Sequence, residues 1–425
     1  MKPTDAPGRA ALAGRLATLA AVTGRHAAAA AFDAVRAGPG ALPEVAGRRT
    51  ALLLYGLGPT FVKGGQLLST RTDLLPPRVC GALGGLHDRV APMTRAQTAD
   101  ALARAYGPDR HHWPFTAFDW TATASGSIAC VHRARLADGR CVAVKLRRPG
   151  IRRRMHADFA LLRTGAQLLQ RLPPLRKVPA LRIVEELGGA VLGQLDLERE
   201  ARSLAALRTN LAGLPYFRLP APVPEASGPG ALVMDFIEPL ERFRAGSLDR
   251  EQRRRIVRNV LQGVYRMLFI DGLVHCDMHP GNLYLNPDGV VVLLDAGFVI
   301  QLEPQVRRLF AEFFMNMSLG RAAECADVVL RSAEYIPPGV DLSAFRSGIE
   351  SLVAATTGRQ AGEFRLAPFA TRLFDLQRRS GIAAAPAFVF PLMSLLVLEG
   401  MINEFDVDVD FQGEAIPTLL TALNT

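Results

Sequence analysis

Hydrophobic residues recur with helical spacing along the first quarter of the chain. Residues 1–110 are rich in Ala, Leu and Arg, and the pattern is interrupted at Gly38-Pro39-Gly40 and at Pro76-Pro77. Glycine and proline are disfavoured inside helices, so we expect separate helices on either side of these two points. The Ala-rich stretch 10–36 is interrupted by arginines, which predicts an amphipathic helix and not a secretory signal.

Alternating hydrophobic and polar residues begin after residue 111. The runs 131–136 and 141–145 both alternate, and Asp138-Gly139 lies between them. Two such runs around Asp-Gly predict a β-hairpin. Short β-like runs also occur at 216–219 and 232–237. We therefore expect a small β-rich region in the middle of the chain.

The remaining pattern is mainly helical. Helical spacing spans 151–172, 181–211 and 249–271, and Pro173-Pro174 separates the first two segments. A hydrophobic run at 290–294 predicts a strand, and helical patterns follow it to the end of the sequence. The whole pattern indicates an α+β protein with a helical prefix, a small β-rich lobe and a larger helical lobe.

One uncharged segment is long enough to be considered as a membrane-spanning helix. Residues 380–398 carry no charge, and a span needs about 18 or more apolar residues. However, Pro386 and Pro391 interrupt this segment, and several acidic residues follow soon after it. These features favour a buried core helix from about Phe390, with a membrane span as the alternative.

Composition and charge narrow the class of protein. The 425 residues are 49% hydrophobic and 21% charged, which excludes a wholly disordered chain and a small disulfide scaffold. The net charge of +10 suggests an anionic partner, while the low aromatic content of 7% argues against single-stranded nucleic acid. The five cysteines are scattered without a paired motif, which indicates a reducing compartment.

Candidate chemistry is carried by four residues in a particular order. Asp277 and Asn282 have the spacing D-x-x-x-x-N, Asp295 ends a later apolar run, and Lys145 ends a Val-Ala-Val-Lys strand pattern. Phosphoryl transfer uses an Asp to orient or deprotonate the attacking hydroxyl, and an Asn and a second Asp to hold Mg²⁺. A strand lysine contacts the phosphate oxygens in the same chemistry. The four residues together favour phosphoryl transfer.

Each of these residues also has a simpler explanation when it is taken alone. Lys145 could be a solvated strand residue, and Asp295 could merely end a strand. His275, Cys276, Asp277 and His279 could form a zinc site, although no fourth well-spaced soft ligand is evident elsewhere.

The order of the motifs resembles the UbiB (AarF, ADCK) family of atypical protein-kinase-like proteins. Residues 57–77 resemble the KxGQ segment of that family, with Lys63 and Gln66 at its named positions. Residues 275–282 resemble its catalytic loop, and residues 294–298 stand where its DFG-like metal motif falls. The resemblance implies a protein-kinase-like, two-lobed fold with an N-terminal helical extension.

The resemblance also implies a division of the chain and roles for individual residues. The expected domains are a helical extension carrying the KxGQ motif at 1–110, an N-lobe at 111–238 and a helical C-lobe at 239–425. The expected catalytic residues are Asp277, Lys145, Glu200, Lys63 and Gln66. The expected nucleotide contacts are Ala124, Ser125, Gly126, Ser127, Lys145, Met234, Asp235 and Ile237. The expected metal ligands are Asn282 and Asp295.

The sequence departs from the family pattern at several positions. The Ala-rich loop contains Gly126, which adds backbone freedom, and Ala129 and Cys130 replace the usual Gly and Gln. Gln194 replaces an acidic residue of the ExD motif, and Ala296 replaces the usual Phe of the metal motif. The changes in the Ala-rich loop leave the choice between ADP and ATP open.

The function implied by the resemblance is that of an atypical kinase or ATPase that binds ATP or ADP with Mg²⁺. It would support the biosynthesis of a quinone such as ubiquinone, or of another isoprenoid lipid. Because the KxGQ segment would cover the peptide groove, we expect ATP hydrolysis in place of protein phosphorylation in trans. The alternatives are a nucleotide-binding pseudokinase scaffold and a small-molecule phosphotransferase of a specialised pathway.

The expected partners are a nucleotide, anionic membrane lipid and lipid-biosynthesis proteins, and no nucleic acid is expected. Basic runs at 145–154 and 253–255 are either solvated faces or sites that attract anionic headgroups. We therefore expect a cytoplasmic protein, peripheral to the inner face of the membrane.

Overall fold

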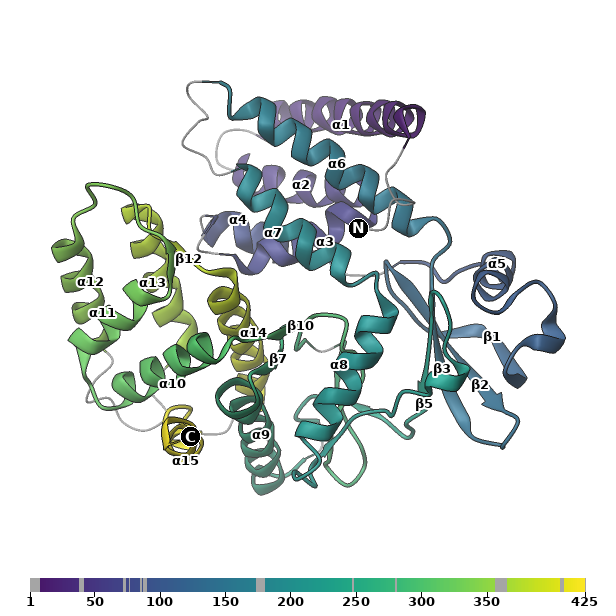
Figure 1. The fold of residues 1–425 in the computed structure, drawn as a ribbon. Helices are drawn as coiled ribbons and strands as arrows, with labels where there is room; N and C mark the ends of the chain where they lie inside the picture. Colours follow the sequence, from purple (N-terminus) through teal and green to yellow (C-terminus); the bar gives the residue numbers. More distant parts are fainter. Residues whose placement is uncertain are drawn as a thin grey trace. The chain divides into compact units, whose positions relative to one another are not determined.

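The fold is that of a computed structural model (Figure 1). It describes residues 8–37, 42–71, 74–75, 77–84, 86, 90–172, 180–246, 248–279, 281–355, 365–405 and 409–424. The expected breaks at Gly38-Pro39-Gly40, Pro76 and Pro173-Pro174 concern residues outside this set. The chain forms two compact units. The first comprises Met1–Arg71, Leu75–Ala201 and Pro222–Phe236, and the second comprises Thr72–Leu74, Arg202–Ala221 and Ile237–Thr425.

Helices form most of the first unit, and the helical prefix predicted from the sequence is confirmed. The prefix contains α1 (Arg9–Ala37), α2 (Leu42–Leu57), α3 (Pro59–Thr70), α4 (Pro77–Gly84) and α5 (Arg95–Tyr106). After the first three strands come α6 (Ile151–Leu169), α7 (Ala180–Gly193) and the start of α8 (Leu197–Asn210). Helices α6 and α7 lie side by side in this unit (Figure 1).

The prediction of one helix over 181–211 is wrong, because the chain turns between α7 and α8. The Asp196 carboxylate accepts a hydrogen bond from the backbone N–H of Arg199 at 2.9 Å. An acidic side chain in this position satisfies an N–H group that a helix start leaves unpaired. Asp196 therefore marks the start of a new helix, α8. The hydrophobic pattern of the sequence continues through this position and does not indicate the turn.

A buried charged network fixes the start of α3. Asp158 of α6 accepts from the Arg15 guanidinium at 2.5 and 3.0 Å and from the Thr60 hydroxyl at 2.6 Å. Arg15 also donates to the carbonyl oxygen of Leu57 at 2.7 Å. Gly58 between these residues has φ +108°, and a Cβ there would collide with the Arg154 guanidinium. The helix that carries Lys63 and Gln66 is thus anchored at its first turn.

The sheet of the first unit has four antiparallel strands in the order β1-β2-β3-β5. They are β1 (Phe115–Ser125), β2 (Ala129–Leu136), β3 (Cys141–Arg147) and β5 (Ala231–Asp235). The hairpin predicted around Asp138-Gly139 is confirmed as β2 and β3, with Gly139 at φ +87°. Strand β1 was not predicted, because its partly buried residues do not alternate regularly with exposed ones and its pairing with β2 contains register shifts.

The second unit combines small sheets with a helical core. One sheet has the order β4-β9-β8-β6, and β7 pairs with β10 and β11 with β12. These strands are β4 (Phe217–Arg218), β6 (Glu241–Arg242), β7 (Leu273–His275), β8 (Leu283–Leu285), β9 (Val291–Leu293), β10 (Val299–Gln301), β11 (Ala333–Tyr335) and β12 (Ala383–Ala384). The strand expected at 290–294 is β9, but the later β10, β11 and β12 were not expected.

The helices of the second unit are α9 (Arg250–Tyr265), α10 (Pro304–Ser318), α11 (Ala322–Arg331), α12 (Leu342–Ala354), α13 (Leu366–Ser380), α14 (Pro386–Asn403) and α15 (Ile416–Asn424). The helix predicted at 249–271 continues beyond α9 as a π-helical turn, η6 (Arg266–Asp271).

Helix α14 is the helix in the described part of the chain that is long and apolar enough to cross a membrane. Two thirds of it is buried inside the fold. Its Glu399 carboxylate accepts from the backbone N–H groups of Leu366 and Ala367 at 2.6 and 2.8 Å, at the start of α13. This packing favours the interpretation as a core helix. The helix begins at Pro386, earlier than the predicted Phe390, because proline is well tolerated in a first turn.

Candidate functional site

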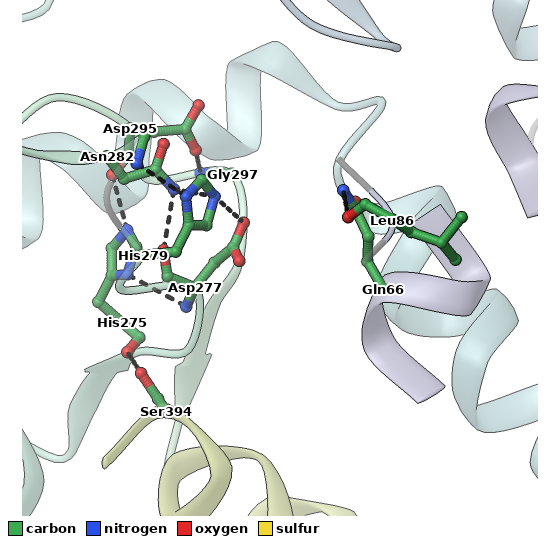
Figure 2. Close-up of polar contacts among 10 residues, drawn as sticks. Gln66, Leu86, His275, Asp277, His279, Asn282, Asp295, Gly297 and Ser394 are labelled. Carbon is green, nitrogen blue, oxygen red and sulfur yellow. Dashed lines mark hydrogen bonds and ion pairs between the residues drawn. The ribbon is translucent and has the colours of Figure 1, made fainter. Parts of the chain in front are cut away.

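The loop after β7 brings Asp277, His279 and Asn282 together (Figure 2). The side-chain amide of Asn282 donates to the carbonyl oxygen of Asp277 at 2.8 Å. The His279 Nε2 lies 3.6 Å from the Asp277 carboxylate and 3.3 Å from the Asn282 amide nitrogen. Pro280, also part of the motif, lies outside the described residues. The loop therefore gathers the Asp and Asn of the D-x-x-x-x-N spacing in the second unit.

His275 joins this loop to the segment that carries Asp295. Its Nε2 lies 2.8 Å from the carbonyl oxygen of Asp295, and its Nδ1 accepts from the backbone N–H of Asp277 at 3.2 Å. These bonds require a neutral imidazole with its proton on Nε2. Burial lowers the pKa of His275, which favours this neutral form. The Ser394 hydroxyl of α14 also donates to the His275 carbonyl at 3.0 Å.

Asp295 and Asn282 stand at neighbouring strand ends. Strands β8 and β9 pair with Leu283 opposite Leu293, and the N–H of Leu294 donates to the carbonyl oxygen of Asn282 at 3.1 Å. One carboxylate oxygen of Asp295 accepts from the N–H of Gly297 at 2.7 Å. Because the Asn282 amide nitrogen binds Asp277, its oxygen points away from that bond. A carboxylate and an amide oxygen form a donor set that fits Mg²⁺.

The zinc alternative has no support from this geometry. Both ring nitrogens of His275 are engaged with backbone groups, so neither is directed at a metal ion. Burial raises the pKa of the Cys276 thiol, and its sulfur donates to the carbonyl oxygen of Val274. Across the described residues there is no group of three or more His, Cys, Asp and Glu that could hold a metal ion.

The first unit brings together Lys145 and Glu200. The Lys145 Nζ on β3 lies 2.6 Å from a Glu200 carboxylate oxygen in the first turn of α8. The Glu200 side chain is 2% exposed and that of Lys145 is 14% exposed, so solvent screens this pair weakly. The turn at Asp196 that starts α8 also sets the position of Glu200.

Residues 124–127 form the end of β1 and the turn into β2. Ser125 pairs with Cys130, and the N–H of Gly126 donates to the carbonyl oxygen of Ala129 at 2.9 Å. Ser127 is buried. The four residues thus form a tight, closed turn at the sheet edge.

Lys63 and Gln66 lie on α3 of the first unit. The Gln66 amide donates to the carbonyl oxygen of Leu86 at 3.3 Å (Figure 2), and the Lys63 side chain is half-buried. The Gln66 bond therefore ties α3 to the chain that follows α4.

Met234 and Asp235 lie on β5, where they pair with Ala143 and Val142 of β3. Ile237 follows as a buried residue of the second unit. The expected site residues are therefore divided: Ile237, Asp277, Asn282 and Asp295 belong to the second unit, and the others belong to the first.

The sequence reasoning considered His275 as a zinc ligand and as the first residue of a catalytic-loop-like segment, and it did not predict the bonds of this side chain to the backbone of Asp277 and Asp295. The available signal is its position two residues before Asp277, at the end of a buried strand. A histidine there can reach both the loop and the next strand.

Residues 85–329 match the model of the ABC1 atypical kinase-like domain. The chain is 30% identical over 383 residues to the "Probable protein kinase UbiB" of Aliivibrio fischeri, which covers 88% of this chain and 70% of that protein. It is 31% identical over 386 residues to the protein of the same name from Cronobacter sakazakii, with the same coverage.

A solved structure with a similar fold is that of the complex of Rv3197 and erythromycin from Mycobacterium tuberculosis. The TM-score is 0.59 at 21% sequence identity, over 82% of this chain and 89% of that chain. The predicted fold, α+β and protein-kinase-like, is confirmed by the domain match and this similarity.

Proposed function

The chain belongs to the ABC1 atypical kinase-like family, and from this membership we propose that it binds a magnesium nucleotide and acts on its terminal phosphate. The observation that carries the proposal is the 2.6 Å ion pair between Lys145 and Glu200. In protein kinases a strand lysine must be held by a helix glutamate before it can pair with the nucleotide phosphates. A buried lysine without such a partner would lose its charge more readily.

The residues proposed to contact the nucleotide are those that the family resemblance implies. Lys145 would contact phosphate oxygens, and the turn formed by Ala124–Ser127 would lie over them. The backbone of Met234, Asp235 and Ile237 would offer hydrogen-bonding groups to an adenine. Lys63 and Gln66 would act at the same site, where Lys63 can bond a phosphate oxygen and Gln66 can orient a neighbour.

Mg²⁺ would be held by Asn282 and Asp295, which supply the hard oxygen donors that it prefers. Bound there, the metal would neutralise charge on the phosphates. Asp277 would orient or deprotonate the attacking water or hydroxyl group. The His279 Nε2 lies 3.6 Å from the Asp277 carboxylate, beside the position where this group would act.

The biological role that we propose is support of quinone or other isoprenoid-lipid biosynthesis by ATP hydrolysis. The relatives named as probable UbiB protein kinases support this role. The net charge of +10 supports peripheral binding to anionic lipid on the cytoplasmic side of a membrane. Such binding should weaken as salt is raised, because exposed charges are screened.

A second candidate is a nucleotide-binding scaffold without turnover. It is favoured by Gln194, which stands where the family pattern has an acidic residue. The retained Lys145, Asp277 and Asp295 oppose it.

Steady-state phosphate release from MgATP, with and without anionic vesicles at low and high salt, tests the proposal. Asp277→Asn should lower the turnover by about 100-fold or more, as expected for loss of a positioned general base. The matched control is Asp288→Asn, an exposed acid in the turn between β8 and β9. Nucleotide binding without phosphate release from the parent protein would favour the scaffold. Transfer of phosphate to an added metabolite would indicate a phosphotransferase.

A further inference from the structure

Arg148 directly follows β3, and its side chain donates hydrogen bonds to the turn between β1 and β2. Its Nε donates to the carbonyl oxygen of Gly126 at 2.9 Å. Its Nη2 donates to the Ser125 hydroxyl at 2.8 Å and to the carbonyl oxygen of Ala91 at 2.7 Å. Its backbone N–H donates to the carbonyl oxygen of Ile128 at 2.8 Å. One residue thus bonds three positions of the turn and the chain segment beside it.

The other contacts of the turn also restrain it. The Ser125 hydroxyl donates to the carbonyl oxygen of Val90 at 2.8 Å, next to the Ala91 that Arg148 binds. Ile128 is buried in a hydrophobic cluster with residues of α6 and α7, and Leu67 and Leu68 of α3 pack against the same cluster. Hydrogen bonds and hydrophobic packing therefore restrain the backbone of this turn within the first unit. An exposed glycine-rich loop would lack such restraints.

The basic run around Arg148 has local partners, which argues against a uniform surface for lipid headgroups. Lys145 pairs with Glu200, and Arg147 donates to the carbonyl oxygen of Leu195 at 2.8 Å. Arg154 donates to the carbonyl oxygen of Leu57 at 3.2 Å. The sequence motif that suggested either a solvated face or a lipid site therefore includes several structural contacts, among them those of Arg148 to the turn.

We propose that Arg148 is a positioning residue that fixes the backbone of residues 124–127 against the phosphates of the nucleotide. The inference rests on the proposed function and assigns a residue outside the expected nucleotide contacts. Its bonds to Gly126, Ser125 and Ala91 need donors on two nitrogens of one rigid plane. A lysine keeps the positive charge and has three N–H donors, but they all lie on one atom, so it cannot reproduce bonds that leave from both Nε and Nη2.

The experiment compares Arg148→Lys with the parent protein and with Arg135→Lys as a matched control. Arg135 donates to the carbonyl oxygen of Gly139 at 2.8 Å on the exposed β2–β3 hairpin, away from the turn. Calorimetric titration with MgATP, MgADP and adenosine separates phosphate contacts from base contacts. In Arg148→Lys we expect affinity for both nucleotides to fall by about ten-fold or more, with adenosine affinity within about two-fold of parent.

Hydrogen–deuterium exchange of peptides covering 122–131 gives a second readout on the nucleotide-free protein. Exchange should be faster in Arg148→Lys and unchanged in Arg135→Lys, with parental melting temperatures in both. Unchanged exchange would overturn the inference, and so would an equal loss of affinity for adenosine and ATP. A parent protein that binds nucleotide, with a variant that binds it equally well, would overturn this inference alone. A parent that binds no nucleotide would overturn the proposed function.

Discussion

The imidazole of His275 is bonded through Nε2 to the carbonyl oxygen of Asp295, at 2.8 Å, and so connects the D-x-x-x-x-N loop to the metal motif. Its other ring nitrogen accepts from the N–H of Asp277 at 3.2 Å. The backbone positions of Asp277, the expected general base, and Asp295, the expected metal ligand, are thus both linked to one neutral side chain.

We predict that acid destabilises this connection. The unfolded pKa of histidine is about 6.5, and burial lowers that of His275 in the folded state. Below pH 6.5 the unfolded chain therefore binds a proton that the folded chain excludes, and stability falls as pH falls towards the folded pKa. Urea unfolding at pH 7.5 and 5.5 should show this loss in the parent.

The comparison for this prediction is His275→Gln. The variant should be less stable at pH 7.5 but should lose less stability between the two pH values. His132 in the other unit also has a pKa lowered by burial, so only the difference between parent and variant isolates His275. His111→Gln changes an exposed histidine and should behave as the parent. An identical pH dependence in parent and His275→Gln would contradict the prediction.

Asp295→Asn should weaken Mg²⁺-dependent nucleotide binding while the fold is retained. The amide keeps one oxygen but loses the charge that attracts the cation. The amide oxygen of the variant can still accept from the backbone N–H of Gly297, so we expect the local backbone conformation to be retained. Titration of nucleotide with and without Mg²⁺ should show a metal-dependent gain in the parent and little gain in the variant. Equal affinity of both proteins in the presence of Mg²⁺ would remove Asp295 from the metal site.

The sequence predicted the fold where the signal is local and failed where long-range contacts decide. The hairpin at Asp138-Gly139 was predicted because the turn residues and the alternation agree. Strand β1 was not, because register shifts in its pairing with β2 disturb the alternation of buried and exposed residues along it. The break at Asp196 was hidden, since the hydrophobic pattern continues through it.

The same limit applies to the site. The types of residue and their order suggested phosphoryl transfer, but the contact between Lys145 and Glu200 joins positions 55 apart in sequence. Only resemblance to a family suggested that contact. His275 and Arg148 donate to backbone carbonyl oxygens that come close to them only in the folded chain. The pattern of residue types does not predict such contacts.

Lys63→Ala and Gln66→Ala test whether α3 acts at the site or only packs. A hydrogen bond to a charged group contributes about 1.5–3 kcal/mol, so Lys63→Ala should change nucleotide affinity or hydrolysis by roughly ten-fold or more. Affinity or hydrolysis should fall if Lys63 binds the nucleotide phosphates, and should rise if Lys63 restricts access to them. Gln66→Ala also removes the bond to Leu86. Arg153→Ala, which removes an exposed cation of α6, should have parental kinetics. Parental melting together with unchanged kinetics in both test variants would show that α3 is only structural.

Glu399→Ala should strongly destabilise the second unit. The buried Glu399 carboxylate accepts from the N–H groups of Leu366 and Ala367, so it satisfies two donors at the start of α13. Its negative charge also interacts favourably with the positive end of the α13 helix dipole. Loss of both bonds should lower the free energy of unfolding by about 2–4 kcal/mol. Glu399→Gln should lose less, because the amide oxygen can still accept one N–H. Glu404→Ala removes an exposed acid near the end of α14, where the helix dipole disfavours negative charge, and should be neutral or slightly stabilising.

Urea unfolding at constant pH, with vesicle flotation, checks both the stability and the membrane question for α14. If α14 is a core helix, the three variants should differ in unfolding midpoint, and vesicle binding of the parent should be lost at high salt. A parental midpoint for Glu399→Ala would show that the bonds to α13 contribute little. Binding that persists at high salt, and increases in Glu399→Ala, would instead indicate insertion of α14. That result would be expected only if α14 leaves the core, because a carboxylate engaged with two backbone amides cannot enter the hydrocarbon without losing both bonds.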